Sequence, residues 1–123
     1  MKEKVNPEKV GFAHIEVCSW FDIKYAAEKG FLLNFTNFGD DSVIPEDITL
    51  SQIIYLAKKG FINQIMISQD FSYSVKEKKL IPYFPYPYHY IFEVVVPRLL
   101  KSGLKEKDIE IIFKKNPKKY LEI

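Results

Sequence analysis

The sequence predicts an α/β fold with about three parallel strands and about four helices. Three short apolar runs, Val10–Ala13, Phe31–Phe35 and Ile65–Ser68, are each followed by a stretch with helical spacing. Short strands that alternate with helices are typical of strand–helix units, whose strands run parallel. His14 follows the first run and Asp70 follows the third. Both side chains are therefore expected at the carboxyl ends of neighbouring strands, where α/β enzymes build their sites.

The composition is that of one globular domain, which we assign to residues 1–123. The chain is 47% hydrophobic and 28% charged, and its formal charge is +2. That charge is too near balance to favour nucleic acid or an acidic membrane surface as a partner. The single cysteine, Cys18, excludes an internal disulfide and fits a reducing compartment. No apolar stretch approaches the roughly 20 residues that span a bilayer, so we expect a cytoplasmic protein with no membrane partner.

The first two units carry clear helix boundaries. Ser19 and Asp22 have the spacing of a capping box at a helix start, and Gly30 is placed as the stop. The buried face of that helix is expected to carry Ile23, Ala26 and Ala27. In the second strand one face is apolar and the other becomes polar toward Thr36. After a loop over residues 37–47, a second helix that ends at Gly60 is marked by Leu50, Ile53, Ile54 and Ala57.

The last third of the chain predicts a long loop and two helices. Residues 71–87 show neither a helical nor a strand period and carry Tyr73, Tyr83, Phe84 and Tyr86, so we predict a long aromatic loop. A helix is predicted over Tyr88–Lys101, with a kink at Pro97. A final helix is predicted over Lys105–Lys115, ending where Asn116 precedes a proline.

Several motifs occur in a fixed order: GFAHIE, FTNFG, AKKGFINQIMISQD, YIFEVVVPRLLKSGL and KKNPKKYL. In this order and spacing they resemble the carboxyl-terminal part of the phosphotriesterase-like family in the amidohydrolase superfamily. These proteins are metal-dependent hydrolases built on a (β/α)8 barrel. The resemblance implies that the chain is a carboxyl-terminal fragment of such a TIM barrel, containing strands six to eight. Within the family it leans towards the sugar-lactone hydrolases, some of which act on phosphorylated furanose lactones.

The resemblance also implies roles for two residues. His14 resembles the metal-binding histidine after the sixth strand, and Asp70 resembles the aspartate after the eighth. In the family that aspartate binds a metal and helps to take the proton from the attacking hydroxide, so Asp70 is also the candidate catalytic residue. The implied cofactor is a divalent metal, with zinc favoured, which is binuclear in the intact family. Imidazole and carboxylate suit zinc or manganese, and zinc lowers the pKa of bound water to about 7.

The sequence departs from the family pattern at several ligand positions. Gln69 stands where the family usually has a histidine, and Thr36 where it usually has an aspartate. The His-x-His after strand one, the lysine or glutamate after strand four and the histidine after strand five have no counterpart. The alternative for Asp70 is a carboxylate that caps the turn after a strand, and for His14 a satisfied histidine at a strand end. We expect His89 to have a packing or loop-anchoring role rather than a catalytic one.

Two hypotheses about function follow. Three parallel strands cannot close a barrel, and the outer strands of an open sheet offer unpaired backbone groups to a neighbour. The first hypothesis is a hydrolase of lactones or phosphoesters that acts on a small molecule only when a complementing N-terminal half-barrel chain supplies the missing ligands. The second is a non-catalytic remnant, or an oligomer-forming protein that covers its sheet by self-association.

Overall fold

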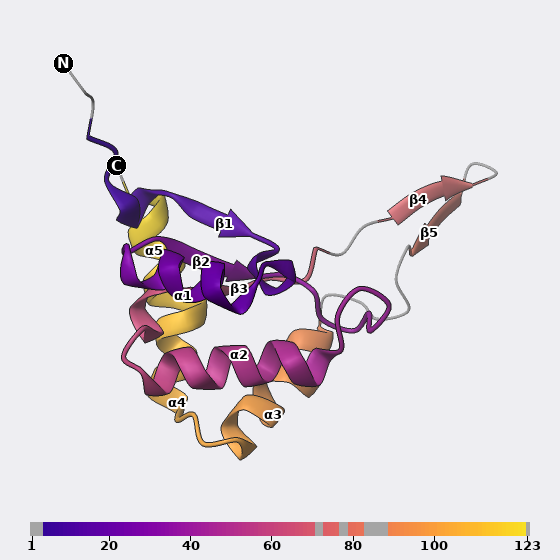
Figure 1. The fold of residues 1–123 in the computed structure, drawn as a ribbon. Helices are drawn as coiled ribbons and strands as arrows, with labels where there is room; N and C mark the ends of the chain where they lie inside the picture. The colour runs from indigo at the N-terminus through magenta and orange to yellow at the C-terminus, as the bar shows by residue number, and fades with distance from the viewer. Residues whose placement is uncertain (1–3, 71–72, 77–78, 83–88, 123) are drawn as a thin grey trace.

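The computed structural model describes residues 4–70, 73–76, 79–82 and 89–122 of the chain. Three parallel strands, β1 (Gly11–Ala13), β2 (Leu32–Phe35) and β3 (Ile65–Ile67), form one sheet in the order β1-β2-β3. Helix α1 (Trp20–Glu28) connects the first two strands, and α2 (Glu46–Lys58) lies between the second and the third (Figure 1). The predicted α/β class and parallel sheet are therefore confirmed.

Helix α1 begins and packs as its sequence predicts. The Ser19 side chain accepts a hydrogen bond from the Asp22 backbone N–H at 3.1 Å, which satisfies one of the free donors of the first turn. The buried face carries Ile23, Ala26 and Ala27. Gly30 follows the helix with φ +84°, a conformation that glycine adopts without a steric penalty. The chain can therefore turn sharply into β2.

The two faces of the sheet differ in polarity. Leu33 and Phe35 on β2, with Ile65 on β3, are fully buried in the main apolar cluster, together with side chains from the helices. Asn34 alternates with them on the strand, and its side-chain oxygen accepts a hydrogen bond from the Ser68 hydroxyl at 3.2 Å. The face that carries Asn34 is thus polar toward its carboxyl edge, as the alternation in the sequence predicts.

Residues 71–87 differ from the prediction of a loop without strands. Strands β4 (Tyr73–Lys76) and β5 (Lys79–Pro82) pair antiparallel as a hairpin, which lies apart from the three-stranded sheet (Figure 1). The sequence pattern did not reveal these two strands. The predicted loop positions 71–72, 77–78 and 83–87 lie outside the described residues.

The helices after the hairpin contain two π-helical turns. The π-helix η4 (Ile91–Val95) continues into α3 (Val96–Lys101), and α4 (Glu106–Glu110) continues through a second π-helix, η5 (Ile111–Lys115), into α5 (Asn116–Leu121). With α1 and α2, the described residues thus form four helical segments besides short 3-10 turns. Within these residues no helix combines the length and the apolar character needed to cross a membrane.

The prediction that the last helix ends before Pro117 is wrong. The helix runs on to Leu121, and the Asn116 backbone N–H bonds to the carbonyl of Ile111, five residues back. A proline inside an α-helix lacks an N–H and clashes with the carbonyl four residues earlier. The wider π turn before the proline relieves that clash, and the helix continues. The same device precedes Pro97, where the N–H of Val96 bonds to the carbonyl of Ile91.

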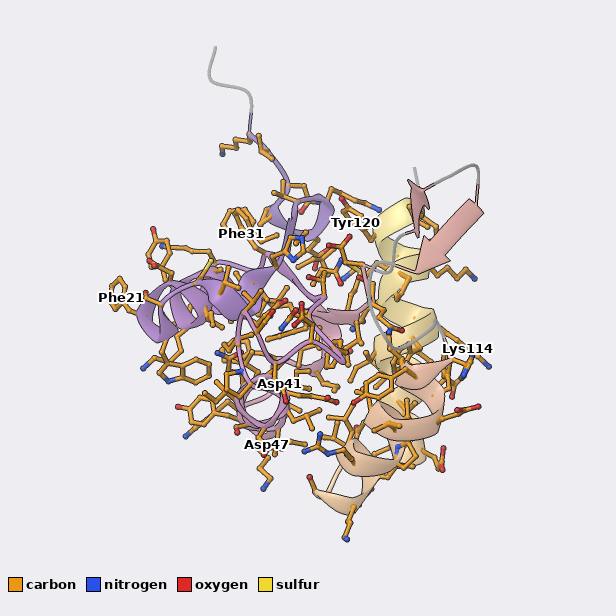
Figure 2. All side chains as sticks on the ribbon, turned by 90° about the vertical axis from the view of Figure 1, so that its right-hand side faces the viewer. Phe21, Phe31, Asp41, Asp47, Lys114 and Tyr120 are labelled. Atoms are coloured by element: carbon orange, nitrogen blue, oxygen red, sulfur yellow. The ribbon has the colours of Figure 1, made fainter. Side chains whose placement is uncertain are left out.

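Side chains cover most of this framework (Figure 2). Lys114 lies on the outer side of the carboxyl-terminal helices, and Phe21 projects from α1 with 74% of its surface exposed (Figure 2). Phe12, Val17 and Tyr25 in the same part of the chain are also exposed. Apolar surface therefore gathers around β1 and α1, at one side of the sheet.

Candidate metal centre

His14 and Asp70 lie together at the carboxyl edge of the sheet. His14 directly follows β1, and Asp70 comes three residues after the end of β3. The imidazole Nε2 is 3.3 Å from the carboxylate Oδ2 of Asp70. The strands that carry them are not direct neighbours, because β2 lies between them and ends next to Thr36. The two residues singled out in the sequence thus meet across three strands.

Both residues have a left-handed backbone conformation. The φ angle is 55° at His14 and 54° at Asp70, and they are the non-glycine residues with positive φ in the described part of the chain. This conformation is uncommon for non-glycine residues, although Asp and His tolerate it better than most. Residues in such conformations persist where the surrounding structure holds them, and they cluster at functional sites. Backbone conformation and side-chain chemistry therefore both indicate His14 and Asp70 as functional residues.

Two buried residues, Thr36 and Glu16, lie behind His14. The family resemblance had marked Thr36 as a departure at a ligand position, whereas the sequence did not identify Glu16 as part of the site. The Thr36 hydroxyl is 2.5 Å from His14 Nδ1 and 3.1 Å from Glu16 Oε1. The Thr36 backbone N–H donates to both Glu16 carboxylate oxygens, at 3.2 and 3.3 Å. The Glu16 side chain is completely buried. A hydrogen-bonded chain therefore runs from a buried carboxylate through a threonine to the candidate ligand.

The sequence carried only a weak signal for Glu16. It lies two residues after His14 on the short 3-10 turn η2 (Ile15–Val17), and charged side chains are almost never fully buried without partners. Its partner is Thr36, twenty residues further along the chain. Asp22, by contrast, lies in the first turn of α1, where its carboxylate accepts a hydrogen bond from the hydroxyl of the N-cap Ser19 at 2.6 Å. His89 forms an ion-pair contact with Glu93 and does not line the pocket beside His14.

The separation of the two side chains fits a shared cation. Two ligands bound at about 2.0–2.2 Å to one tetrahedral zinc lie about 3.3–3.6 Å apart. The 3.3 Å between His14 Nε2 and Asp70 Oδ2 falls in that range. A small pocket of about 20 Å³ adjoins them, which is room for about one water molecule or ion. It is lined by His14, Thr36, Asn37, Phe38, Asp40, Gln69 and Asp70.

Two ligands are what the described residues offer. In that part of the chain, no group of three or more His, Cys, Asp and Glu side chains is placed to hold a metal ion. Asp40 is a further carboxylate at the pocket, and the hydrogen bonds from the Ser42 hydroxyl and backbone N–H lower its pKa. Asp40 therefore stays ionised and adds negative charge that favours a cation nearby.

Comparison with known proteins identifies the family. The sequence profile of the phosphotriesterase family matches residues 3–121. An aryldialkylphosphatase of Saccharolobus solfataricus is 32% identical over an alignment that covers 97% of this chain and 40% of that protein. The chain thus spans less than half the length of this curated relative.

Solved structures show the same fold. The phosphotriesterase homology protein of Escherichia coli, complexed with phosphate in its active site, superposes with a TM-score of 0.79 at 21% identity, covering 96% of this chain and 40% of the other. The phosphotriesterase of Mycobacterium tuberculosis superposes with a TM-score of 0.81 at 19% identity, covering 96% of this chain and 38% of the other. The three-stranded sheet and its helices therefore correspond to part of the TIM barrel of these proteins. Since the family profile matches nearly the whole sequence, the chain belongs to the phosphotriesterase family.

Proposed function

We propose that this chain supplies part of the metal site of a metal-dependent hydrolase, with His14 and Asp70 as metal ligands. The observation that carries the proposal is the 3.3 Å approach of His14 Nε2 and Asp70 Oδ2 at the carboxyl edge of the sheet. One nitrogen and one carboxylate donor suit zinc or manganese, and zinc is the ion that we propose. When bound, the metal would polarise the substrate and activate a water molecule.

The exposure of the two side chains suits catalysis. His14 and Asp70 have side chains that are 52% and 63% exposed, so both water and a substrate can reach them. A carboxylate beside the attacking water can accept its proton as a general base, and this is the role we propose for Asp70. The proposed substrates are phosphoesters or lactones. The phosphoester alternative is supported by the aryldialkylphosphatase relative and by the phosphate in the Escherichia coli homologue.

We propose that a second polypeptide supplies the remaining ligands. Catalytic zinc sites have three protein ligands as a rule, and the described residues bring together two. In the described part of the chain β1 and β3 are the edge strands of the sheet, so each has one side open to pairing. We propose that a complementing N-terminal half-barrel, in a second polypeptide, pairs with these edges and completes the site.

The exposed apolar surface near β1 supports a covering partner. A largely apolar pocket of about 210 Å³ lies beside exposed Phe12 and Tyr25. Apolar side chains that gather on one surface typically mark a contact with another chain. The same surface also supports the second candidate function, a non-catalytic protein that associates with itself. The lone Cys18, which is a free thiol, supports the further proposal that the protein is cytoplasmic.

Zinc titration by calorimetry tests the proposed ligands. The chain is expected to bind one zinc ion at micromolar concentration, and His14→Ala and Asp70→Asn should each abolish the heat of binding. His89→Ala is the matched control, because this exposed histidine contacts Glu93 instead, and it should leave binding unchanged. If the unaltered chain binds no zinc, or if His89→Ala weakens binding as much as His14→Ala, the proposed site is wrong.

Co-expression distinguishes the two candidate functions. The partner would be the segment of the Saccharolobus solfataricus relative that precedes its match to this chain. A stable complex with zinc-dependent hydrolysis of an aryl dialkyl phosphate or a lactone would support the hydrolase. A homo-oligomer in light scattering, with no zinc bound and no complex formed, would favour the non-catalytic protein.

A further inference from the structure

The contacts behind His14 restrict where its hydrogen atoms can be. The Thr36 hydroxyl has a single hydrogen, but it lies within hydrogen-bond distance of two acceptors, Glu16 Oε1 at 3.1 Å and His14 Nδ1 at 2.5 Å. It can donate to only one of them. A neutral imidazole likewise carries one hydrogen, either on Nδ1 or on Nε2. With a neutral imidazole and an ionised Glu16, two arrangements of these hydrogens are therefore compatible with the atomic positions.

In the first arrangement the threonine hydroxyl donates to Glu16 and accepts from the Nδ1–H of His14. The Nε2 lone pair then faces the Asp70 carboxylate at 3.3 Å, so two acceptors meet there. In the second arrangement the hydroxyl donates to Nδ1, and an Nε2–H donates to Asp70. The hydroxyl oxygen then faces the Glu16 oxygen at 3.1 Å, so the two acceptors meet at that contact instead.

Burial decides between the two arrangements. Thr36 is 4% exposed and the Glu16 side chain is 0% exposed, so neither water nor an ion can relieve a clash of acceptors between them. The side chains of His14 and Asp70 are 52% and 63% exposed, so a water molecule or a cation can stand at their contact. Two facing acceptors are therefore tolerated between His14 and Asp70, where solvent has access, but not between Thr36 and Glu16, which are buried.

We infer that Thr36 and Glu16 are positioning residues that hold His14 in the tautomer with hydrogen on Nδ1. The Nε2 lone pair then points at Asp70, in the protonation form that binds a metal. A hydrogen bond from the second ring nitrogen orients a metal-binding histidine and raises its basicity. The functional role of this tautomer rests on the proposed metal site. The tautomer itself exists, and can be measured, without any metal.

Long-range proton–nitrogen NMR of the full chain tests the tautomer directly. The chain has two histidines, so the exposed His89 serves as an internal reference. In alkaline buffer, where free imidazole is neutral, His14 should show Nδ1 as the protonated nitrogen and Nε2 as the bare one. The opposite pattern in the unaltered chain would overturn the inference, and so would an averaged pattern that matches His89.

A pair of variants tests whether Thr36 causes the effect. Thr36→Val keeps the shape but removes the hydroxyl, and it should shift His14 toward the pattern of His89. Zinc affinity should fall by about 10- to 100-fold, the range found when the partners behind metal ligands are removed. Thr36→Ser restores a hydroxyl and should restore both the NMR pattern and the affinity. If Thr36→Val leaves the tautomer unchanged, Thr36 is not the positioning residue.

The two readouts separate failure of this inference from failure of the proposed function. A chain that binds no zinc but shows the Nδ1–H tautomer refutes the metal site and leaves the positioning network intact. A chain that binds zinc through His14 but shows the other tautomer before zinc is added refutes the network alone. Because the spectrum of the unaltered chain decides the tautomer, the test remains valid even if Thr36→Val does not fold.

Discussion

Polar side chains at the two ends of the parallel sheet include two contrasting pairs, Asn116 with Gln64 at the amino end and His14 with Asp70 at the carboxyl end. At the amino end, the side-chain amide of Asn116 donates to the carbonyls of Ile62 and Ile65, at 2.8 and 2.7 Å. The amide of Gln64 likewise donates to two backbone carbonyls, at 2.7 and 3.0 Å. At the carboxyl end, His14 and Asp70 face each other with half or more of each side chain exposed. The two amides at the amino end satisfy backbone carbonyls, whereas His14 and Asp70 at the carboxyl end remain open to a ligand.

This difference teaches where stability and function reside. The amide groups at the amino end hold segments that are far apart in the sequence, with donors matched to acceptors, so their loss should cost stability alone. The carboxyl end holds strained backbone and facing acceptors, so changes there should affect binding more than stability. In TIM barrels generally, the carboxyl end of the strands carries the chemistry and the opposite end carries stability. Single substitutions at the two ends can test this division.

The largest loss of stability is expected for Asn116→Ala. Asn116 is 3% exposed, and its removal takes away two hydrogen bonds and leaves buried carbonyl groups without their donor. Two such losses should lower the free energy of unfolding by about 2–4 kcal/mol. Urea denaturation measures the change. Asn63→Ala is the matched control, since Asn63 is exposed, and it should stay within about 0.5 kcal/mol of the parent.

A smaller loss is expected for Gln64→Ala. Gln64 makes the same kind of paired contact, to the carbonyls of Ala27 and Phe31, but it is only half-buried. Water can replace part of its hydrogen bonding, so the expected cost is about 1–2 kcal/mol in the same denaturation experiment. A cost above that of Asn116→Ala would show that burial does not rank the two contacts.

A substitution at the carboxyl end is expected to leave the free energy of unfolding unchanged or to raise it slightly. Asp70 has a φ of 54°, which glycine adopts without strain, so Asp70→Gly relieves a cost of about 1 kcal/mol. Glycine also loses more entropy on folding, about 0.4–1 kcal/mol, so the net change should lie between zero and a small gain. Zinc binding should be lost.

The control for this prediction is an acidic residue with ordinary helical geometry. Glu110 is exposed and lies at the end of α4, and Glu110→Gly should lower the free energy of unfolding by about 1 kcal/mol. If Asp70→Gly destabilises the chain as much as Glu110→Gly does, the left-handed backbone at Asp70 stores no strain, and the contrast between the two ends is weaker than proposed.

The sequence predicted features that depend on neighbouring residues. The strands, the Ser19 start of α1 and its buried face follow from local periods and caps. The meeting of His14 and Asp70 follows from one rule, that parallel strands end at the same edge. Features that depend on distant residues were missed. Glu16 is explained only by Thr36, and the helix that passes Pro117 is explained only by the π turn of the backbone. The hairpin strands β4 and β5 were also missed.

The smallest expected effect concerns pH and Asp40, at the edge of the candidate metal pocket. Hydrogen bonds from Ser42 lower the pKa of Asp40 below its ordinary value of 3.8. A carboxyl whose pKa is lowered by folding stabilises the folded state above the unfolded-state value, and the contribution is lost as pH falls through the lowered value. Ser42→Ala should therefore reduce stability at neutral pH, and the difference from the parent should shrink below about pH 4 and vanish in stronger acid.

This effect should be well under about 1 kcal/mol, because solvent screens the exposed Asp40 carboxylate. Denaturation at a series of pH values measures it, with Ser102→Ala as control. The Ser102 hydroxyl donates to the Arg98 carbonyl, a group that does not titrate, so any change it causes should be independent of pH. A difference between Ser42→Ala and the parent that stays constant down to strong acid would show that Ser42 does not act through the Asp40 carboxylate. The Ser42 hydroxyl would then not help to keep Asp40 ionised at this pocket. The contact would resemble the amide contacts at the other end of the sheet, which do not titrate.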